Sequence, residues 1–145
     1  LHSIGMYPIA QLMQKIKPER IADPEMSFVD VAKWERREVG RDHARVGSQL
    51  LQGWGFHSDI YEPVANCLHP LLCESARRSA SLLHIARRVS PCLIDPAIDF
   101  EEIHLPPSLL DACELEEEDV ASYLGSAMAW LHATSDLISH ELLSA

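Results

Sequence analysis

Apolar residues recur at spacings of three and four along most of this chain, as they do on the buried faces of helices. The first such segment covers residues 4–17 and ends before Pro18, because proline cannot continue a helix. Its apolar face consists of Ile9, Leu12, Met13 and Ile16. The dipeptides typical of hairpin turns are absent and only 6 of the 145 residues are glycine, so the pattern favours no strands. The sequence therefore predicts an all-α fold.

Capping residues predict where the next helices begin and end. An Asp or Ser side chain can accept a hydrogen bond from the first turn, and a Gly permits the left-handed conformation that closes the last turn. The second segment is predicted to begin at Asp23 and Pro24 and to end at Gly40. The third is predicted to run from Asp42 to Gly55, and the fourth from Ser58 to His69. Gly47 lies on the inward face of the third segment, where another helix can approach closely.

The chain changes character near Pro91, which ends a fifth helical segment over residues 71–90. Residues 91–107 contain four prolines and are interpreted as a connector. A short helix is predicted over 107–113, and a long last helix follows. The sequence thus predicts a helical core over residues 1–90. Residues 91–145 form a proline-rich connector and a C-terminal helical arm of the same domain.

A long amphipathic face runs along the predicted last helix. It consists of Val120, Leu124, Ala127, Leu131, Thr134, Ile138 and Leu142. This face either packs on the chain's own core, as most amphipathic faces do, or forms a docking surface for another protein. The candidate residues of a docking surface are Trp130, Leu131 and His132.

The net charge of −10 narrows the range of partners. No Lys or Arg follows Arg88, and such an acidic surface repels nucleic acid and anionic lipid. No apolar run reaches the ~18 residues of a membrane-spanning helix. The four cysteines form no C-x-x-C pair, which disfavours a zinc ribbon or a redox motif. They are interpreted as reduced, mostly buried thiols of a cytoplasmic protein.

Histidines are the candidate chemical groups, with eight in the chain. His2, His43 and His69 each lie at or near a predicted helix end, where neutral imidazoles could bind a transition metal. Few carboxylates accompany them, and Asp42 is better explained as a helix cap. The alternative is a structural role, with hydrogen bonds across helix ends. His84 is expected to be a satisfied core residue. The sequence contains no G-x-S-x-G, P-loop or G-x-G-x-x-G motif.

Four segments together resemble one family. The segment "ERREVG" at 35–40 runs into "RDHARVGSQLLQGWGF" at 41–56, and "IYEPVANCLHP" follows at 60–70. The segments "LHSIGM" at 1–6 and "SLLHIARRV" at 81–89 lie on either side. This order resembles the HDOD family, the HD-related output domains of bacterial signalling proteins. The resemblance is strong over residues 1–90.

The resemblance implies a multi-helix bundle of the HD-domain-like type with a long C-terminal helix. The chain would then begin partway through such a domain and carry its C-terminal portion. The motif residues are expected to be structural. They are Glu35, Gly40, Asp42, His43, Gly47, Leu50 and Trp54. Trp34 and Trp54 would anchor the bundle by burying large side chains.

The resemblance also bears on catalysis. Related phosphohydrolases hold their metal with a His-Asp pair and a later Asp. Here the pair position reads His2-Ser3, the later Asp position reads Arg87, and Met6 replaces a Lys of active relatives. A guanidinium adds repulsion where a metal needs an anion. The resemblance therefore implies no metal, no cofactor and no hydrolysis, with His2, His43 and His69 as vestigial candidates.

The expected function is that of a catalytically inactive signalling module, which binds a protein partner or another domain of its own chain. The alternative is a metal-dependent HD phosphohydrolase acting on nucleotides or cyclic dinucleotides through His2, His43 and His69. A weaker alternative is a small-ligand sensor that uses the pocket in which related phosphohydrolases hold their metal and substrate. The sequence leaves the oligomeric state open.

Overall fold

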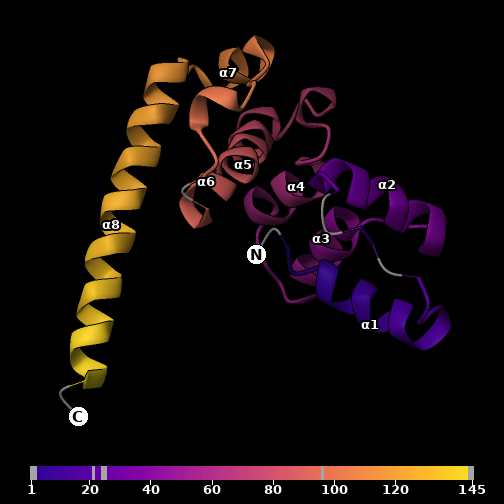
Figure 1. The fold of residues 1–145 in the computed structure, drawn as a ribbon. Coiled ribbons are helices and arrows are strands. Elements are labelled where there is room, and N and C mark those ends of the chain that lie inside the picture. Colours follow the sequence, from indigo (N-terminus) through magenta and orange to yellow (C-terminus); the bar gives the residue numbers. More distant parts are fainter. Residues whose placement is uncertain (1–2, 21, 24–25, 96, 144–145) are drawn as a thin grey trace. The chain divides into compact units, whose positions relative to one another are not determined.

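The computed structural model describes residues 3–20, 22–23, 26–95 and 97–143, with side chains as far as Thr134 in the last helix. This described part contains α-helices and two short 3-10 turns but no strand, which confirms the predicted all-α fold (Figure 1). The helices are α1 (Met6–Ile16), α2 (Phe28–Val39), α3 (His43–Gly53), α4 (Ser58–Asn66), α5 (Arg77–Val89), α6 (Pro91–Ile94), α7 (Pro107–Cys113) and α8 (Glu117–Leu143). The 3-10 turns are Pro70–Leu72 and Phe100–Glu102.

The chain divides into two compact units, an N-terminal unit of residues 1–84 and a C-terminal unit of residues 85–145. The division falls within α5. The sequence predicted a boundary at residue 90 between the HDOD-like core and the C-terminal arm of one domain. That boundary is of another kind than the division into compact units, and it stays a prediction.

In the N-terminal unit, α3 is the helix that contacts α1, α2 and α4. Its inward face carries Ala44, Gly47 and Leu51, all of them buried. A small core forms around it from Ala32, Ala44, Cys67 and Leu68, with Phe28 and Leu83 packed against its edge. Small side chains dominate this core, so the helices can lie close together.

Two glycines, Gly5 and Gly47, lie where the start of α1 approaches α3 closely. A Cβ on Gly5 would collide with the backbone of His43 and Gly47. A Cβ on Gly47 would lie 3.2 Å from the backbone nitrogen of Gly5 and 3.3 Å from Ile4 Cγ2. The start of α1 therefore packs directly on the backbone of α3. This confirms the close approach predicted at Gly47, and it identifies its partner as Gly5.

The boundaries of α2 and α3 follow local chemistry, with one correction. Gly40 ends α2 in the left-handed conformation with φ of 78°, and Asp42 caps α3 by accepting a hydrogen bond from the Arg45 N–H at 2.9 Å, both as predicted. The predicted start of α2 at Asp23 is wrong, because the Ser27 hydroxyl caps this helix by accepting from the Asp30 N–H. The predicted first residue, Pro24, lies outside the described residues.

Two further starts differ from the prediction. The α4 cap is His57, whose Nδ1 accepts from the Asp59 N–H at 3.4 Å, and Ser58 is already helical. Helix α5 begins at Arg77 rather than residue 71. The chain there first forms the 3-10 turn that starts at Pro70, since proline favours the first position of a helical turn.

The expected anchoring role of Trp54 is wrong. Its side chain is 58% exposed, because α3 ends at Gly53 and the chain turns away at Gly55, which has φ of 81°. Leu50 is only partly buried, and so is Trp34 on α2. The aromatic side chains of this unit therefore lie at its edges, while small residues fill its centre.

The C-terminal unit has a larger apolar core. It consists of Ile85, Val89, Cys92, Leu105, Leu109, Leu110, Cys113, Val120 and Leu124. Burial raises the pKa of the Cys92 thiol. None of the four cysteines forms a disulfide in the described residues, in agreement with their interpretation as thiols. The short helix predicted over 107–113 is α7.

The beginning of α8 packs on this core through Val120 and Leu124, as predicted for the amphipathic face. The described side chains from Ala129 to Ala133 are exposed, and Leu131 on the predicted inward face is 41% exposed. The inward face therefore ends before Leu131 in the described part of α8. Among the described residues, no helix is both long enough and apolar enough to cross a membrane.

Candidate functional site

The most polar buried part of the N-terminal unit is the corner between α2 and α3. Gly40 reverses the chain at the end of α2, and Asp42 begins α3 two residues later. The short connection brings the last turns of α2 beside the first turn of α3. Three buried charged or imidazole residues therefore gather here, namely Glu35, Asp42 and His43.

Glu35 and His43 form a buried pair across this corner. Glu35 Oε2 accepts a hydrogen bond from the His43 backbone N–H at 2.8 Å and lies 2.6 Å from His43 Nδ1. An ionised carboxylate can only accept, so the Nδ1 in this contact carries the proton. One carboxylate oxygen thus holds both the backbone and the ring of His43 in place.

Asp42 uses both of its carboxylate oxygens within the fold. Oδ1 accepts from the Arg45 N–H at 2.9 Å, and Oδ2 accepts from Arg36 Nη1 at 2.8 Å. Arg36 therefore joins α2 to the cap of α3. Its charge compensates the buried carboxylate, which would otherwise be costly to remove from water.

A second ion-pair cluster lies near the end of α2, at Glu38. Its carboxylate accepts from Lys17 at 3.1 Å, Arg37 at 3.2 Å and Arg20 at 3.2 Å. The hydrogen bond from Lys17, followed by that from Arg37, holds the pKa of Glu38 below its ordinary value. Lys17 and Arg20 belong to the segment after α1, so this cluster ties that segment to α2.

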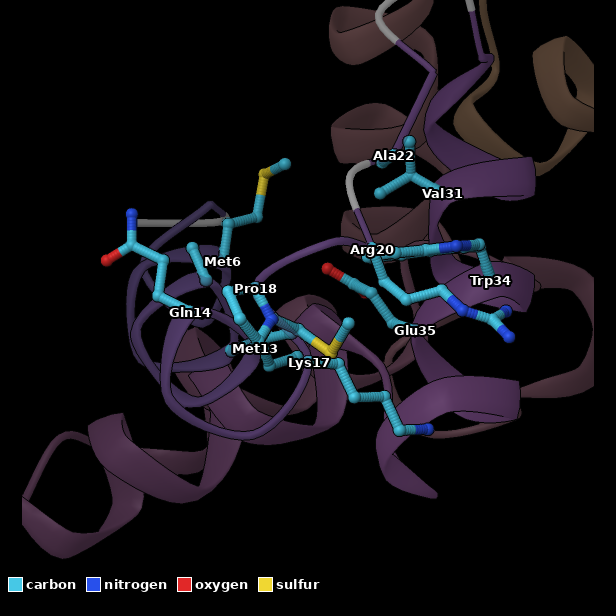
Figure 2. Close-up of a pocket in the computed structure, with 12 residues that line it drawn as sticks. Met6, Met13, Gln14, Lys17, Pro18, Arg20, Ala22, Val31, Trp34 and Glu35 are labelled. Carbon is cyan, nitrogen blue, oxygen red and sulfur yellow. The ribbon is translucent and has the colours of Figure 1, made fainter.

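An apolar pocket of about 410 Å³ lies between α1 and α2 (Figure 2). Figure 2 shows Met6 and Met13 on the α1 side, and Val31 and Trp34 on the α2 side. Glu35 also lines this pocket, so the residue that holds His43 is part of its wall. A mostly apolar pocket with one convergent carboxylate is a typical binding site for a small ligand or for a side chain of a partner.

Sequence reasoning placed Glu35 in the structural motif but did not identify it as the partner of His43. The available signal was its position, because a carboxylate at helical spacing from Phe28, Val31 and Ala32 lies on the inward face of α2. A buried carboxylate needs a donor nearby. Which donor it meets depends on how α2 crosses α3.

The structure does not assemble the predicted histidines into one described site. His2 lies outside the described residues, and His69 is exposed at the start of the 3-10 turn. Among the residues that the structure describes, no group of three or more His, Cys, Asp or Glu side chains could hold a metal ion. His2 is not covered by that statement, so its role stays a prediction.

At two positions the side chains differ from the ligands that the resemblance expects of an HD-type metal centre. Ser3 offers a neutral, exposed hydroxyl, and Arg87 on α5 is a half-buried cation. Both stand where the resemblance expects carboxylates, and a metal ion needs anionic ligands there. The buried Glu35–His43 contact is typical of a metal site, because ligating histidines are often oriented by a carboxylate.

His84 is a satisfied core residue, as predicted. Its Nδ1 lies 2.7 Å from the carbonyl oxygen of Cys67, and its ring meets Phe28 edge-on at 5.1 Å between centroids. The residue is buried. It links the end of α4 to α5 and plays a structural part in the core.

These features define an all-helical domain whose α2–α3 corner is held by a buried carboxylate–imidazole pair. Residues 1–70 match the family model of the HDOD domain, the family that the sequence motifs resemble. The match covers the N-terminal part of the chain and ends at Pro70, short of the expected residue 90, so the segment that carries Arg87 lies beyond it. Comparisons with curated proteins and with solved structures found no match.

Proposed function

We propose that this chain is a non-catalytic HD-related output module of bacterial signal transduction, which acts in the cytoplasm by binding a protein partner or another domain of its own chain. The observation that carries the proposal is that the polar side chains of the α2–α3 corner already hydrogen-bond to one another and to the backbone. Both oxygens of Asp42 and the Nδ1 of His43 take part in hydrogen bonds within the fold. Such groups hold helices together, while Ser3 and Arg87 replace the carboxylates of a metal centre.

Exposed apolar side chains on α1 support partner binding. Ile9 and Met13 are buried, yet Tyr7 is 70% exposed, and Leu12 and Ile16 are also exposed on this one helix. The apolar pocket lies beside them. Contiguous exposed apolar surface on a small domain commonly marks an interaction site. In this proposal the partner inserts an apolar side chain between α1 and α2.

The C-terminal unit offers the second candidate surface. Trp130 is 66% exposed on α8, with Leu131 and His132 exposed beside it. This surface lies in an acidic stretch, because no Lys or Arg follows Arg88. A basic protein segment would complement it, whereas nucleic acid would be repelled.

The alternative function, a metal-dependent phosphohydrolase acting on nucleotides or cyclic dinucleotides, is favoured by one contact. The Glu35 carboxylate orients the His43 ring as carboxylates orient metal-binding histidines. Metal analysis and phosphodiesterase assays on the chain purified without an affinity tag separate the two functions. We expect no stoichiometric metal and no turnover. Tightly held iron, manganese or nickel, together with turnover that a chelator stops, would overturn the proposal.

The binding role is tested by recovering crosslinked partners from cells of the source bacterium. We expect Tyr7→Glu combined with Leu12→Glu to abolish recovery of partners that the unchanged chain captures. Gln11→Glu adds a charge to an exposed polar position of the same helix and is the matched control. Equal recovery with all three chains would remove α1 from the interaction. Trp130→Ala tests the α8 surface in the same way.

A further inference from the structure

A second cavity, of about 590 Å³, lies between α3 and α4. Its walls are polar, in contrast to the apolar pocket between α1 and α2. Arg41, Arg45 and Ser48 line it from the α3 side, and Tyr61 and Glu62 line it from α4. Neither the sequence motifs nor the proposed function assigns a role to it.

The cavity carries two arginines whose charges are not used by the fold. Arg41 and Arg45 are exposed, and neither side chain has an ion-pair or hydrogen-bond partner in the described part of the chain. The third arginine of the cavity, Arg36, is neutralised by Asp42. Glu62 is the remaining charge, and it accepts a hydrogen bond from Ser75 at 3.0 Å. An excess of positive charge therefore lines this cavity, although the chain carries a net charge of −10.

Ser48 is the unexplained polar group in this cavity. The residue is 8% exposed, and its hydroxyl has no hydrogen-bond partner among the described residues. It does not bond back to the carbonyl four residues earlier, as helical serines often do. Among the described residues, only Ser81 Oγ and Arg88 Nε are fully enclosed side-chain polar atoms without a partner, so the Ser48 hydroxyl reaches the cavity, where water or a ligand can hydrogen-bond to it.

The N-terminus of α3 is not the source of this site. Its N–H groups at His43 and Arg45 already donate to Glu35 and Asp42. The groups that remain to bind an anion are the two guanidinium groups and the Ser48 hydroxyl.

We propose that this cavity binds a small phosphate-bearing anion. Guanidinium groups bind phosphate oxygens through paired N–H donors, and a hydroxyl can donate to a third oxygen. Arg41 and Arg45 hold the phosphate at the mouth of the cavity, and the Ser48 hydroxyl donates from its floor. The amides of Gln49 and Gln52 and the ring of Tyr61 line the remaining space. A cavity of this size is within the range that holds a small organic ligand as well as free phosphate.

Isothermal titration of the whole chain with inorganic phosphate and with adenosine 5′-monophosphate tests this proposal, at ionic strength matched with sodium chloride. We expect saturable one-to-one binding of at least one of the two. Tighter binding of the nucleotide would assign the cavity to an organic phosphate, and tighter binding of inorganic phosphate would assign it to the free ion. Absence of binding by both would overturn the proposal.

Three variants connect binding to the named groups. Arg45→Ala and Ser48→Ala are each expected to weaken binding about tenfold, since each removes one hydrogen bond to a charged group. Lys15→Ala removes the same charge from an exposed position of α1 and should leave the affinity unchanged. Ser48→Ala should keep or raise the melting temperature, because its hydroxyl has no partner in the fold. Unchanged affinity in both cavity variants would show that any bound phosphate lies elsewhere and would refute the assignment.

Discussion

The Glu35 carboxylate is the residue on which the α2–α3 corner depends most. It is buried, and the backbone and ring of His43 both donate to one of its oxygens. Neither donor has an easy route to water, because His43 is fully buried. Removing the acceptor would leave two buried donors without it. The free-energy penalty of burying donors that have lost their acceptor exceeds the stabilisation that the hydrogen bonds themselves contribute.

Glu35→Ala is therefore expected to lower the free energy of unfolding by about 3 kcal/mol or more. Glu35→Gln keeps one acceptor oxygen in nearly the same volume and should lose clearly less. Urea unfolding followed by circular dichroism measures both. Equal losses in the two variants would mean that the charge of the carboxylate, which both variants remove, stabilises the corner, and that neither the side-chain volume nor an acceptor oxygen does.

The hydroxyl of Ser81 is expected to lower the stability of the fold. Its hydroxyl is fully buried in α5 and has no hydrogen-bond partner among the described residues. Ser81→Ala removes this hydroxyl and places a better helix former at the position. We expect the free energy of unfolding to rise by about 1–2 kcal/mol. Ser79→Ala, at an exposed position of the same helix, should give only the smaller gain from helix propensity. A loss of stability in Ser81→Ala would point to an unseen partner of the hydroxyl.

At the scale of elements, the approach of α1 to α3 depends on the absence of side chains. Gly5 has φ of −72°, an ordinary helical value, so its need for glycine is purely steric. We expect Gly5→Ala to lower the free energy of unfolding by at least about 2 kcal/mol, because the new Cβ meets backbone that cannot yield. Thermal unfolding measures the change.

Two other glycines serve as controls for that prediction. Gly47→Ala should be less damaging than Gly5→Ala, since its Cβ would meet the flexible side chain of Ile4 at 3.3 Å and the Gly5 nitrogen at 3.2 Å. Gly53 has no atom within 4 Å of the added Cβ, so Gly53→Ala should raise stability by up to about 1 kcal/mol. The reverse order of the three variants would contradict the packing of α1 on α3.

Helix α8 has two parts of different character. Leu124 is buried in the core of the C-terminal unit, whereas Leu131, two turns later, is 41% exposed. Leu124→Ala is expected to cost about 2–4 kcal/mol of unfolding free energy, and Leu131→Ala less than about 1 kcal/mol. Chemical denaturation compares them. Similar costs at both positions would show that Leu131 packs in solution, and the docking surface at Trp130 would lose its support.

At the scale of the whole molecule, charge is distributed unevenly along the chain. Every Lys and Arg lies at or before Arg88, and much of this positive charge serves the fold through Glu38, Asp42 and Asp30. The remaining arginines at the α3–α4 cavity are the groups for which we propose a ligand. In our proposal the acidic C-terminal unit binds a different partner, one with basic residues that complement its charge.

The stability of the molecule should fall in acid partly through Glu38. Its pKa is lowered in the fold, first by the hydrogen bond from Lys17 and then by that from Arg37. A lowered folded pKa stabilises the protein above the unfolded value of about 4.3, and this contribution disappears as the pH falls through the folded value. The melting-temperature difference between the unchanged chain and Glu38→Gln should therefore shrink between pH 7 and pH 3. A difference that stays constant would exclude this role of the carboxylate.

The sequence by itself determined the features that depend on neighbouring residues. The helical spacing of apolar residues established an all-α fold, Gly40 and Asp42 marked a helix end and a helix start, and the motif order indicated the HDOD family. Helix periodicity, caps and left-handed glycines act within one or two turns, so a short window of sequence contains their causes. The starts of α2 and α4 were missed because several nearby residues could cap, and backbone geometry chose among them.

Only the tertiary structure decided which residues meet across helices. It paired Glu35 with His43 and Gly5 with Gly47, left Trp54 exposed, and placed the Ser48 hydroxyl between α3 and α4 without a partner. Each of these facts depends on the angle and distance at which two helices cross. The crossing is set by the packing of many side chains at once, and no single stretch of the sequence contains it.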